Sequence, residues 1–294
     1  MGRKKTYMPY LLMLPTAALL IWLLLYPVGN VFYTSFRREL LTRPKQNGFI
    51  GLDNFVRIGT DPVFWESLVH SFQWVAAEMG LQMVFGLGLA LLLKGRFKGC
   101  GVFRAVIFLP WALSGVLVSM LWSMMYYENV GVLNDLLQRL GILSKAVAWT
   151  GNKHTAFWAL IAAELWRGIP FFSIMLLAAL QSVPQELYEA CRADGGGMRE
   201  NFFYVSFPYI KETLVLTTLL RTIWEFNSVD LILNLTGGGP VHKTTTLAVY
   251  LANTARRDGN FGYGSSLAVV SFLILFVLAG GYLRLSGFGK EERG

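Results

Sequence analysis

The sequence predicts an all-α, polytopic membrane protein with six transmembrane helices and a short polar helix between two of them. Of its 294 residues, 54% are hydrophobic and only 15% are charged, whereas about a quarter of the residues of a soluble domain are charged. Long apolar runs also recur along the chain, and a membrane-spanning helix needs roughly 20 such residues. Surplus apolar surface with little charge is typical of a protein that faces lipid.

The apolar runs locate the predicted spans within one domain of residues 1–294. The spans are residues 8–36, 64–93, 102–127, 156–180, 202–235 and 261–285. The first run follows a basic start, as in a signal peptide. It is too long for the apolar part of a signal peptide and lacks a small-residue cleavage site, so we expect it to be retained. Prolines in or beside the runs are tolerated where neighbouring helices satisfy the freed carbonyls.

The basic residues bear on topology and on partners. The net charge of +8 could suggest a nucleic-acid partner, but Lys and Arg lie between the apolar runs and not on one polar face, so none is expected. Basic residues crowd into the shorter loops if both termini are cytoplasmic, which predicts that orientation in the cell membrane. Cys100 and Cys191 are far apart and lack metal-ligand spacing, so no metal site is expected.

A polar segment between the fourth and fifth spans predicts a helix–turn–helix. Ser182 and Gln185 have the spacing of a capping box, and Pro184 suits a first turn, which predicts a helix from about Val183. The run Asp194–Gly197 ends this helix, because glycine adopts the left-handed backbone of a helix end. A second short helix is expected before the fifth span. An ordinary loop is the alternative from the residues alone.

The same segment resembles the signature of ABC importer permeases. That signature is Glu-Ala-Ala, three residues, Gly, nine residues, Ile, one residue and Leu-Pro. Glu189, Ala190, Gly195 and Pro208 match it at the right spacing. Departures of similar size or character are Cys191, Val205 and Phe207, and further matching stretches are Gly51–Phe55, Leu165–Pro170, Leu180–Pro184 and Leu235–Pro240. The resemblance is closest to maltose and multiple-sugar permeases.

The resemblance implies that the loop of about residues 182–201 seats a coupling helix in a groove of a cytoplasmic ATPase. The expected coupling residues are Glu186, Leu187, Glu189, Ala190, Asp194 and Gly195. Glu189 suits a charge-assisted contact with a basic partner residue, and Tyr188 and Cys191 extend an apolar docking patch around Leu187. ATP and Mg would then bind the ATPase dimer, with no cofactor and no catalytic residue in this chain. The run Gly237–Thr244 lacks the pattern of a phosphate loop and predicts a turn.

Ionisable residues within spans point to a solute site, because they are costly in a bilayer. Helical spacing puts some of them on one face of the fourth span and others on one face of the fifth. The candidate substrate-binding residues are Glu164, Arg167, Gly168, Phe171, Trp224, Asn227 and Asp230. The resemblance implies that such residues line a mid-membrane cavity, where aromatic rings cover sugar C–H faces and polar groups bind hydroxyls.

Some of these ionisable residues could instead have a purely structural role. Glu164 and Arg167 could pair only with each other to fix helix packing, and Asp230 could cap or orient its helix. Glu78 and Gln82, one turn apart in the second span, favour a packing role.

The predicted function is that of a permease subunit of an ATP-driven, binding-protein-dependent importer, which moves a sugar or sugar-like solute into the cytoplasm by alternating access. The implied partners are a second permease, an ATPase dimer and an extracytoplasmic solute-binding protein. An ion-coupled secondary transporter is the alternative, and it predicts a charged relay without a coupling signature. A membrane-embedded enzyme is disfavoured, since no His-Glu-x-x-His or Gly-x-Ser-x-Gly pattern occurs. The solute stays open, as does whether the second permease is a homologue or a copy.

Overall fold

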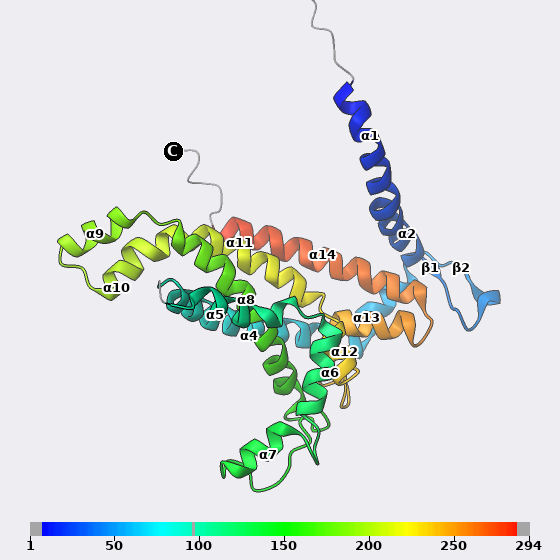
Figure 1. The fold of residues 1–294 in the computed structure, drawn as a ribbon. Coiled ribbons are helices and arrows are strands. Elements are labelled where there is room, and N and C mark those ends of the chain that lie inside the picture. The colour runs from blue at the N-terminus through cyan, green and yellow to red at the C-terminus, as the bar shows by residue number, and fades with distance from the viewer. Residues whose placement is uncertain (1–7, 96–97, 287–294) are drawn as a thin grey trace, which may run out of the picture. The chain divides into compact units, whose positions relative to one another are not determined.

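The computed structural model describes residues 8–95 and 98–286, and these residues are mostly helical (Figure 1). The chain divides into two compact units, Met1–Asp61 with Leu251–Ile274, and Pro62–Tyr250 with Leu275–Gly294. In the described residues the only sheet is a hairpin of two two-residue strands. The predicted all-α fold is therefore confirmed.

The first unit contains the N-terminal span and a short extramembrane layer. Its elements are α1 (Met8–Leu20), the π-turn η1 (Ile21–Leu25), α2 (Tyr26–Ser35), β1 (Arg37–Arg38), the 3-10 turn η2 (Pro44–Gln46), β2 (Gly48–Phe49), α3 (Asp53–Thr60), most of α13 (Leu247–Arg256) and the first part of α14 (Phe261–Ser286). The strands pair antiparallel, with Arg37 opposite Phe49. The Nδ2 atom of Asn54 donates to the carbonyls of Ser35 and Arg37, both at 2.9 Å, and so holds α3 against the end of α2.

The second unit is built on α4 and α8, which run parallel. Its elements are α4 (Pro62–Leu93), α5 (Cys100–Ala112), α6 (Gly115–Met125), α7 (Val132–Arg139), α8 (Ala156–Gln181), α9 (Gln185–Ala193), α10 (Met198–Glu200), the π-turn η3 (Asn201–Ser206), α11 (Phe207–Phe226) and α12 (Asp230–Leu235). The rings of Trp74 and Phe157 meet toward one end of the α4–α8 pair, with centroids 6.2 Å apart. Toward the other end, a Cβ added to Gly86 would lie 2.5 Å from the Cβ of Phe172, so glycine permits the close approach.

Two of the predicted spans are broken into shorter helices. The third consists of α5 and α6, which bend by 97° at a short break. Pro110 lies in the last turn of α5, Leu113 is extended, and the Oγ atom of Ser114 accepts from the backbone N–H of Leu117 to start α6. The fifth run ends its main helix at Phe226, where Asn227 caps α11 by donating to the carbonyl of Ile223 (2.8 Å).

The count of six spans is therefore approximate. Four described helical segments are long and apolar enough to cross a membrane: Tyr10–Ser35, Pro62–Leu93, Ala156–Gln181 and Phe261–Ser286. The bent pair α5–α6 supplies a fifth if it is one span. Helix α11 has 20 residues but carries Lys211, Glu212, Arg221 and Glu225. The protein is a multi-pass membrane protein whose most charged helix contributes to the site described below.

The helix–turn–helix between α8 and α11 forms α9 and α10, which project beyond the ends of those helices (Figure 1). The predicted capping role of Ser182 is wrong, because its hydroxyl donates to the carbonyl of Ala179 and the residue ends α8. Helix α9 instead begins at Gln185, after the extended Pro184. Its end is as predicted, with Gly195 in the left-handed region at φ +84°.

Candidate functional site

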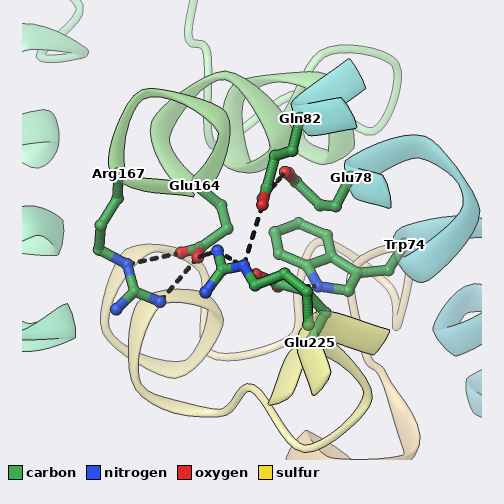
Figure 2. A network of polar contacts seen from close by, with 7 residues as sticks. Trp74, Glu78, Gln82, Glu164, Arg167 and Glu225 are labelled. Carbon is green, nitrogen blue, oxygen red and sulfur yellow. Dashed lines mark hydrogen bonds and ion pairs between the residues drawn. The ribbon is translucent and has the colours of Figure 1, made fainter. Parts of the chain in front are cut away.

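A network of charged side chains joins three helices inside the second unit (Figure 2). Its centre is Arg221 of α11, which is 4% exposed. Its Nη2 atom donates to the Oε1 atom of Glu164 on α8 (3.0 Å), and its Nε atom donates to the Oε1 atom of Gln82 on α4 (2.9 Å). Its Nη2 atom also lies 2.6 Å from the Oε1 atom of Glu225 on its own helix. One guanidinium group therefore ties α4, α8 and α11 together.

Glu164 binds two arginines at once. It is fully buried, and Arg167 donates from Nε to its Oε2 atom (2.9 Å) and from Nη2 to its Oε1 atom (2.7 Å). A two-point contact of this kind fixes the plane of the guanidinium group. Arg167 keeps 22% of its side chain exposed, so the pair is buried on the side of Glu164 and open on the side of Arg167.

The α4 side of the network completes it. The indole N–H of Trp74 donates to the Oε2 atom of Glu225 (3.0 Å), and Gln82 donates to the Oε2 atom of Glu78 (2.8 Å). The other oxygen of Glu78 is buried and has no hydrogen-bond partner among the described residues. Glu164 and Glu225 each contact an arginine, so the two guanidinium groups are matched by two carboxylates and Glu78 is the additional acid. The expected packing role of Glu78 and Gln82 agrees with this position.

A small polar pocket of about 200 Å³ opens beside the network. It brings together four of the predicted substrate-binding residues, Arg167, Trp224, Asn227 and Asp230. Arg167 comes from the middle of α8, Trp224 from the last turn of α11, and the other two from the break before α12 and from its first residue. The break in the fifth run is thus what turns these side chains to one pocket.

Asp230 forms the far wall of this pocket. Its side chain packs over Gly115 at the start of α6, where an added Cβ would lie 3.1 Å from the Cβ of Asp230. The Asp230 carboxylate makes no ion pair within the described part of the chain, and α12 has no side-chain cap at its first turn. The capping interpretation of Asp230 therefore has no hydrogen bond to support it, and its carboxylate lines the pocket near enough to Arg167 for the two charges to attract each other.

The remaining predicted residues lie behind the pocket. Gly168 is buried where an added Cβ would collide with the amide of Gln82 and the guanidinium of Arg221. The ring of Phe171 is buried and lies 5.2 Å from that of Trp224, between centroids. These residues, with Glu164, set the positions of the side chains that line the pocket.

Sequence reasoning missed Arg221, the centre of the network. A signal was present, because Arg221 and Glu225 are four residues apart in an otherwise apolar run, which is the spacing of a helical ion pair. Glu225 is also an ionisable residue within a predicted span, and helical spacing places it beside the face that carries Asn227. Spacing within one helix does not reveal that the partners on α4 and α8 lie at the same depth.

Helix α9 presents the predicted coupling residues to the exterior. Glu186, Leu187, Glu189, Ala190, Asp194 and Gly195 are all exposed. Tyr188 is different: its ring is buried, its hydroxyl shares a hydrogen bond with the Oγ atom of Ser206 (2.9 Å), and the Nζ atom of Lys94 lies 3.8 Å from the ring centroid. The interpretation of Tyr188 as part of the docking patch is wrong, because this side chain anchors α9 to its own unit.

Comparisons with known proteins identify the family of this chain. Residues 82–285 match the family described as binding-protein-dependent transport system inner membrane component. The trehalose/maltose transport system permease protein MalF of Thermococcus litoralis is 34% identical over 96% of this chain and 94% of its own. The sulfoquinovosyl glycerol transport system permease protein SmoG of Agrobacterium fabrum is 35% identical over 94% of this chain and 89% of its own.

A solved structure has the same fold. In the crystal structure of a bacterial ABC transporter involved in the import of the acidic polysaccharide alginate, one chain superposes with a TM-score of 0.83. The match covers 96% of both chains at 20% sequence identity.

Proposed function

Because this chain belongs to the family of binding-protein-dependent transport system inner membrane components, we propose that it is the permease subunit through which an uncharged sugar or sugar-like solute enters the cytoplasm. The pocket of Arg167, Trp224, Asn227 and Asp230 is the proposed contact site for that solute. Movement would follow alternating access, in which the membrane helices rock between outward-open and inward-open arrangements.

The chemistry of the pocket is the observation that carries the proposal. An exposed indole, Trp224, lies beside the amide of Asn227 and the carboxylate of Asp230. A sugar offers C–H faces that pack on an aromatic ring and hydroxyl groups that donate to a carboxylate or an amide oxygen. Such a site binds by a few well-placed polar groups next to an apolar surface.

The charges of the pocket favour an uncharged solute over an anionic one. Among the described residues Arg167 is the only cation that lines it, and the two-point contact with Glu164 neutralises that cation. Asp230 contributes a negative charge that no described residue pairs within ion-pair distance. An anion placed here would meet repulsion in a medium of low dielectric constant, where unpaired like charges are most costly.

The exposed face of α9 is suited to docking on a separate subunit that hydrolyses ATP. We propose that Leu187, Ala190 and Gly195 seat in a groove of an ATPase subunit, with Glu189 contacting a basic residue of that subunit. ATP and Mg would bind to the ATPase dimer and this chain would bring no cofactor. A second permease and an extracytoplasmic solute-binding protein complete the proposed importer, with both termini of this chain in the cytoplasm.

Co-purification tests the class of transporter. Extraction in a mild detergent followed by mass identification of bound proteins should recover an ATPase and a second permease with this chain. Substitution Glu189→Arg should weaken the ATPase contact, while the matched exchange Glu128→Arg, at an exposed position outside the loop of residues 182–201, should not. Uptake that persists without any ATPase would instead support the ion-coupled alternative.

Uptake by the assembled importer tests which solute is carried and whether the pocket residues bind it. Trehalose, maltose and diacetylchitobiose are suitable first probes, because relatives are named for them. Trp224→Ala and Asp230→Asn should each raise the solute concentration needed for half-maximal uptake. Asp230→Asn should also reduce discrimination against a disaccharide that carries a uronic acid. Asp135→Asn is the control, since that carboxylate is exposed on α7 and pairs with Arg139. Unchanged uptake by both pocket variants would contradict the site.

A further inference from the structure

A second pocket, separate from the charged network, lies near the starts of α4 and α8. Its volume is about 600 Å³. Its polar lining includes His70 of α4 together with Lys153, His154 and Lys243, which come from two different loops. No acidic residue from the described part of the chain lines it. The proposed transport function uses none of these residues.

The two lysines are placed by the local fold. Lys153 lies just before the start of α8, and Lys243 lies in a turn where its own N–H donates to the carbonyl of Pro240 (3.0 Å). The hydroxyl of Thr245 donates to the carbonyl of Gly238 (2.8 Å) and closes this turn. Both lysines are exposed and neither makes an ion pair within the described ranges. The site therefore carries two cationic charges that have no ion-pair partner among the described residues.

Apart from Gln73, the rest of the pocket is apolar. Ala76 and Ala77 of α4 and Phe157 of α8 line it, and Trp158 lies beside them with 62% of its surface exposed. Along α4 these alanines come after His70, nearer the middle of the helix. The polar and apolar parts of the pocket are thus arranged in order of depth along the helix.

The length of α4 shows where the polar and apolar parts of the pocket would lie relative to the membrane. Helix α4 has 32 residues, or about 48 Å at 1.5 Å per residue, which exceeds a hydrocarbon layer of about 30 Å. If the layer begins where α4 ends, at Leu93, it reaches about as far as Trp74. His70 then lies at headgroup depth, and Ala76 and Ala77 lie within the hydrocarbon. Trp158 is at the level where indole rings commonly meet the interface.

We propose that this pocket binds one anionic phospholipid, with its phosphate against Lys153 and Lys243 and an acyl chain along Ala76, Ala77 and Phe157. A basic rim, whose lysines make no ion pair among the described residues, lies above an apolar wall, and this order matches the charge and the depth of an anionic phospholipid. Glu66, one turn before His70, is exposed, does not line the pocket and makes no ion pair with either lysine. A small soluble anion would use the rim and leave the apolar wall unexplained.

Lipid binding to the assembled complex tests the proposal. The complex is titrated with phosphatidylglycerol or phosphatidylcholine in nanodiscs, and bound lipid is counted by native mass spectrometry after mild release. We expect a phosphatidylglycerol to be retained by the wild type. In the double variant Lys153→Gln/Lys243→Gln its affinity should fall roughly thirty-fold, because each lysine near an anionic headgroup contributes on the order of a factor of five.

A matched variant distinguishes binding of the lipid in this pocket from general electrostatic attraction of an anionic lipid to a basic protein. Lys45→Gln/Lys145→Gln removes the same charge from exposed positions outside the pocket, and it should retain phosphatidylglycerol as the wild type does. Equal loss in both double variants, equal retention of phosphatidylcholine, or full competition by soluble glycerol phosphate would overturn the lipid assignment. So would a pocket variant that keeps its lipid but no longer responds to an extracytoplasmic binding protein, which would assign the rim to a protein contact.

Discussion

Replacing Arg221 by glutamine should destabilise the second unit more than the loss of any surface charge. The substitution removes a guanidinium group that is 4% exposed and that contacts Glu164, Glu225 and Gln82. Glu164 keeps Arg167, but Glu225 loses its only ion pair among the described residues and keeps the hydrogen bond from the indole of Trp74. Removing one partner of a buried ion pair costs about 3–5 kcal/mol, because the remaining charge stays buried without compensation.

The assay is the free energy of unfolding in mixed micelles, titrated with a denaturing detergent. Arg139→Gln is the matched control, since it also removes an arginine from a helical ion pair spaced by four residues. That pair is exposed, with 76% and 58% of the two side chains accessible, and exposed pairs contribute less than about 1 kcal/mol. The two arginine variants should therefore differ by at least about 2 kcal/mol.

A second variant identifies the cause of the loss. In Arg221→Gln/Glu225→Gln both members of the pair are neutral, so the buried uncompensated charge is gone and most of the lost stability should return. Arg221→Lys should lie in between, because an ammonium group cannot reach three acceptors with the geometry of a guanidinium group. If Arg221→Gln is as stable as Arg139→Gln, or the double variant is no more stable than the single one, the network does not hold these helices together.

Three further predictions use the same unfolding measurement. Gly168→Ala should cost about 1–3 kcal/mol, because its methyl group would collide with the network side chains, whereas Gly80→Ala, with no atom within 4 Å of its added Cβ, should be tolerated. Gly195→Ala should cost about 1–2 kcal/mol through the left-handed backbone at φ +84°, and Gly195→Asn should cost less; equal losses would exclude backbone strain as the cause. Tyr188→Phe should cost about 1 kcal/mol, since it removes the hydrogen bond to Ser206, and an unchanged stability would show that the ring alone anchors α9.

Local features of the sequence predicted the class of the protein and several elements well. Apolar length alone identified the helices Pro62–Leu93, Ala156–Gln181 and Phe261–Ser286, because a membrane span is a property of one continuous segment. The end of α9 at Gly195 was predictable for a similar reason, since the left-handed backbone is a local requirement of the residue. Its start was not, because Ser182 bonds backward into α8 rather than forward into α9.

What the sequence by itself determined is thus the membrane class, the exposed helix between α8 and α11, and the residue types from which a polar site could be built. Only the tertiary structure decided which of those residues meet. Arg221 reaches Gln82 and Glu164 because α4, α8 and α11 pack at one depth. Asp230 reaches the pocket of Arg167 because the chain breaks after Phe226. Contacts between helices depend on their rotation and relative height, and the periodicity of a single helix contains neither.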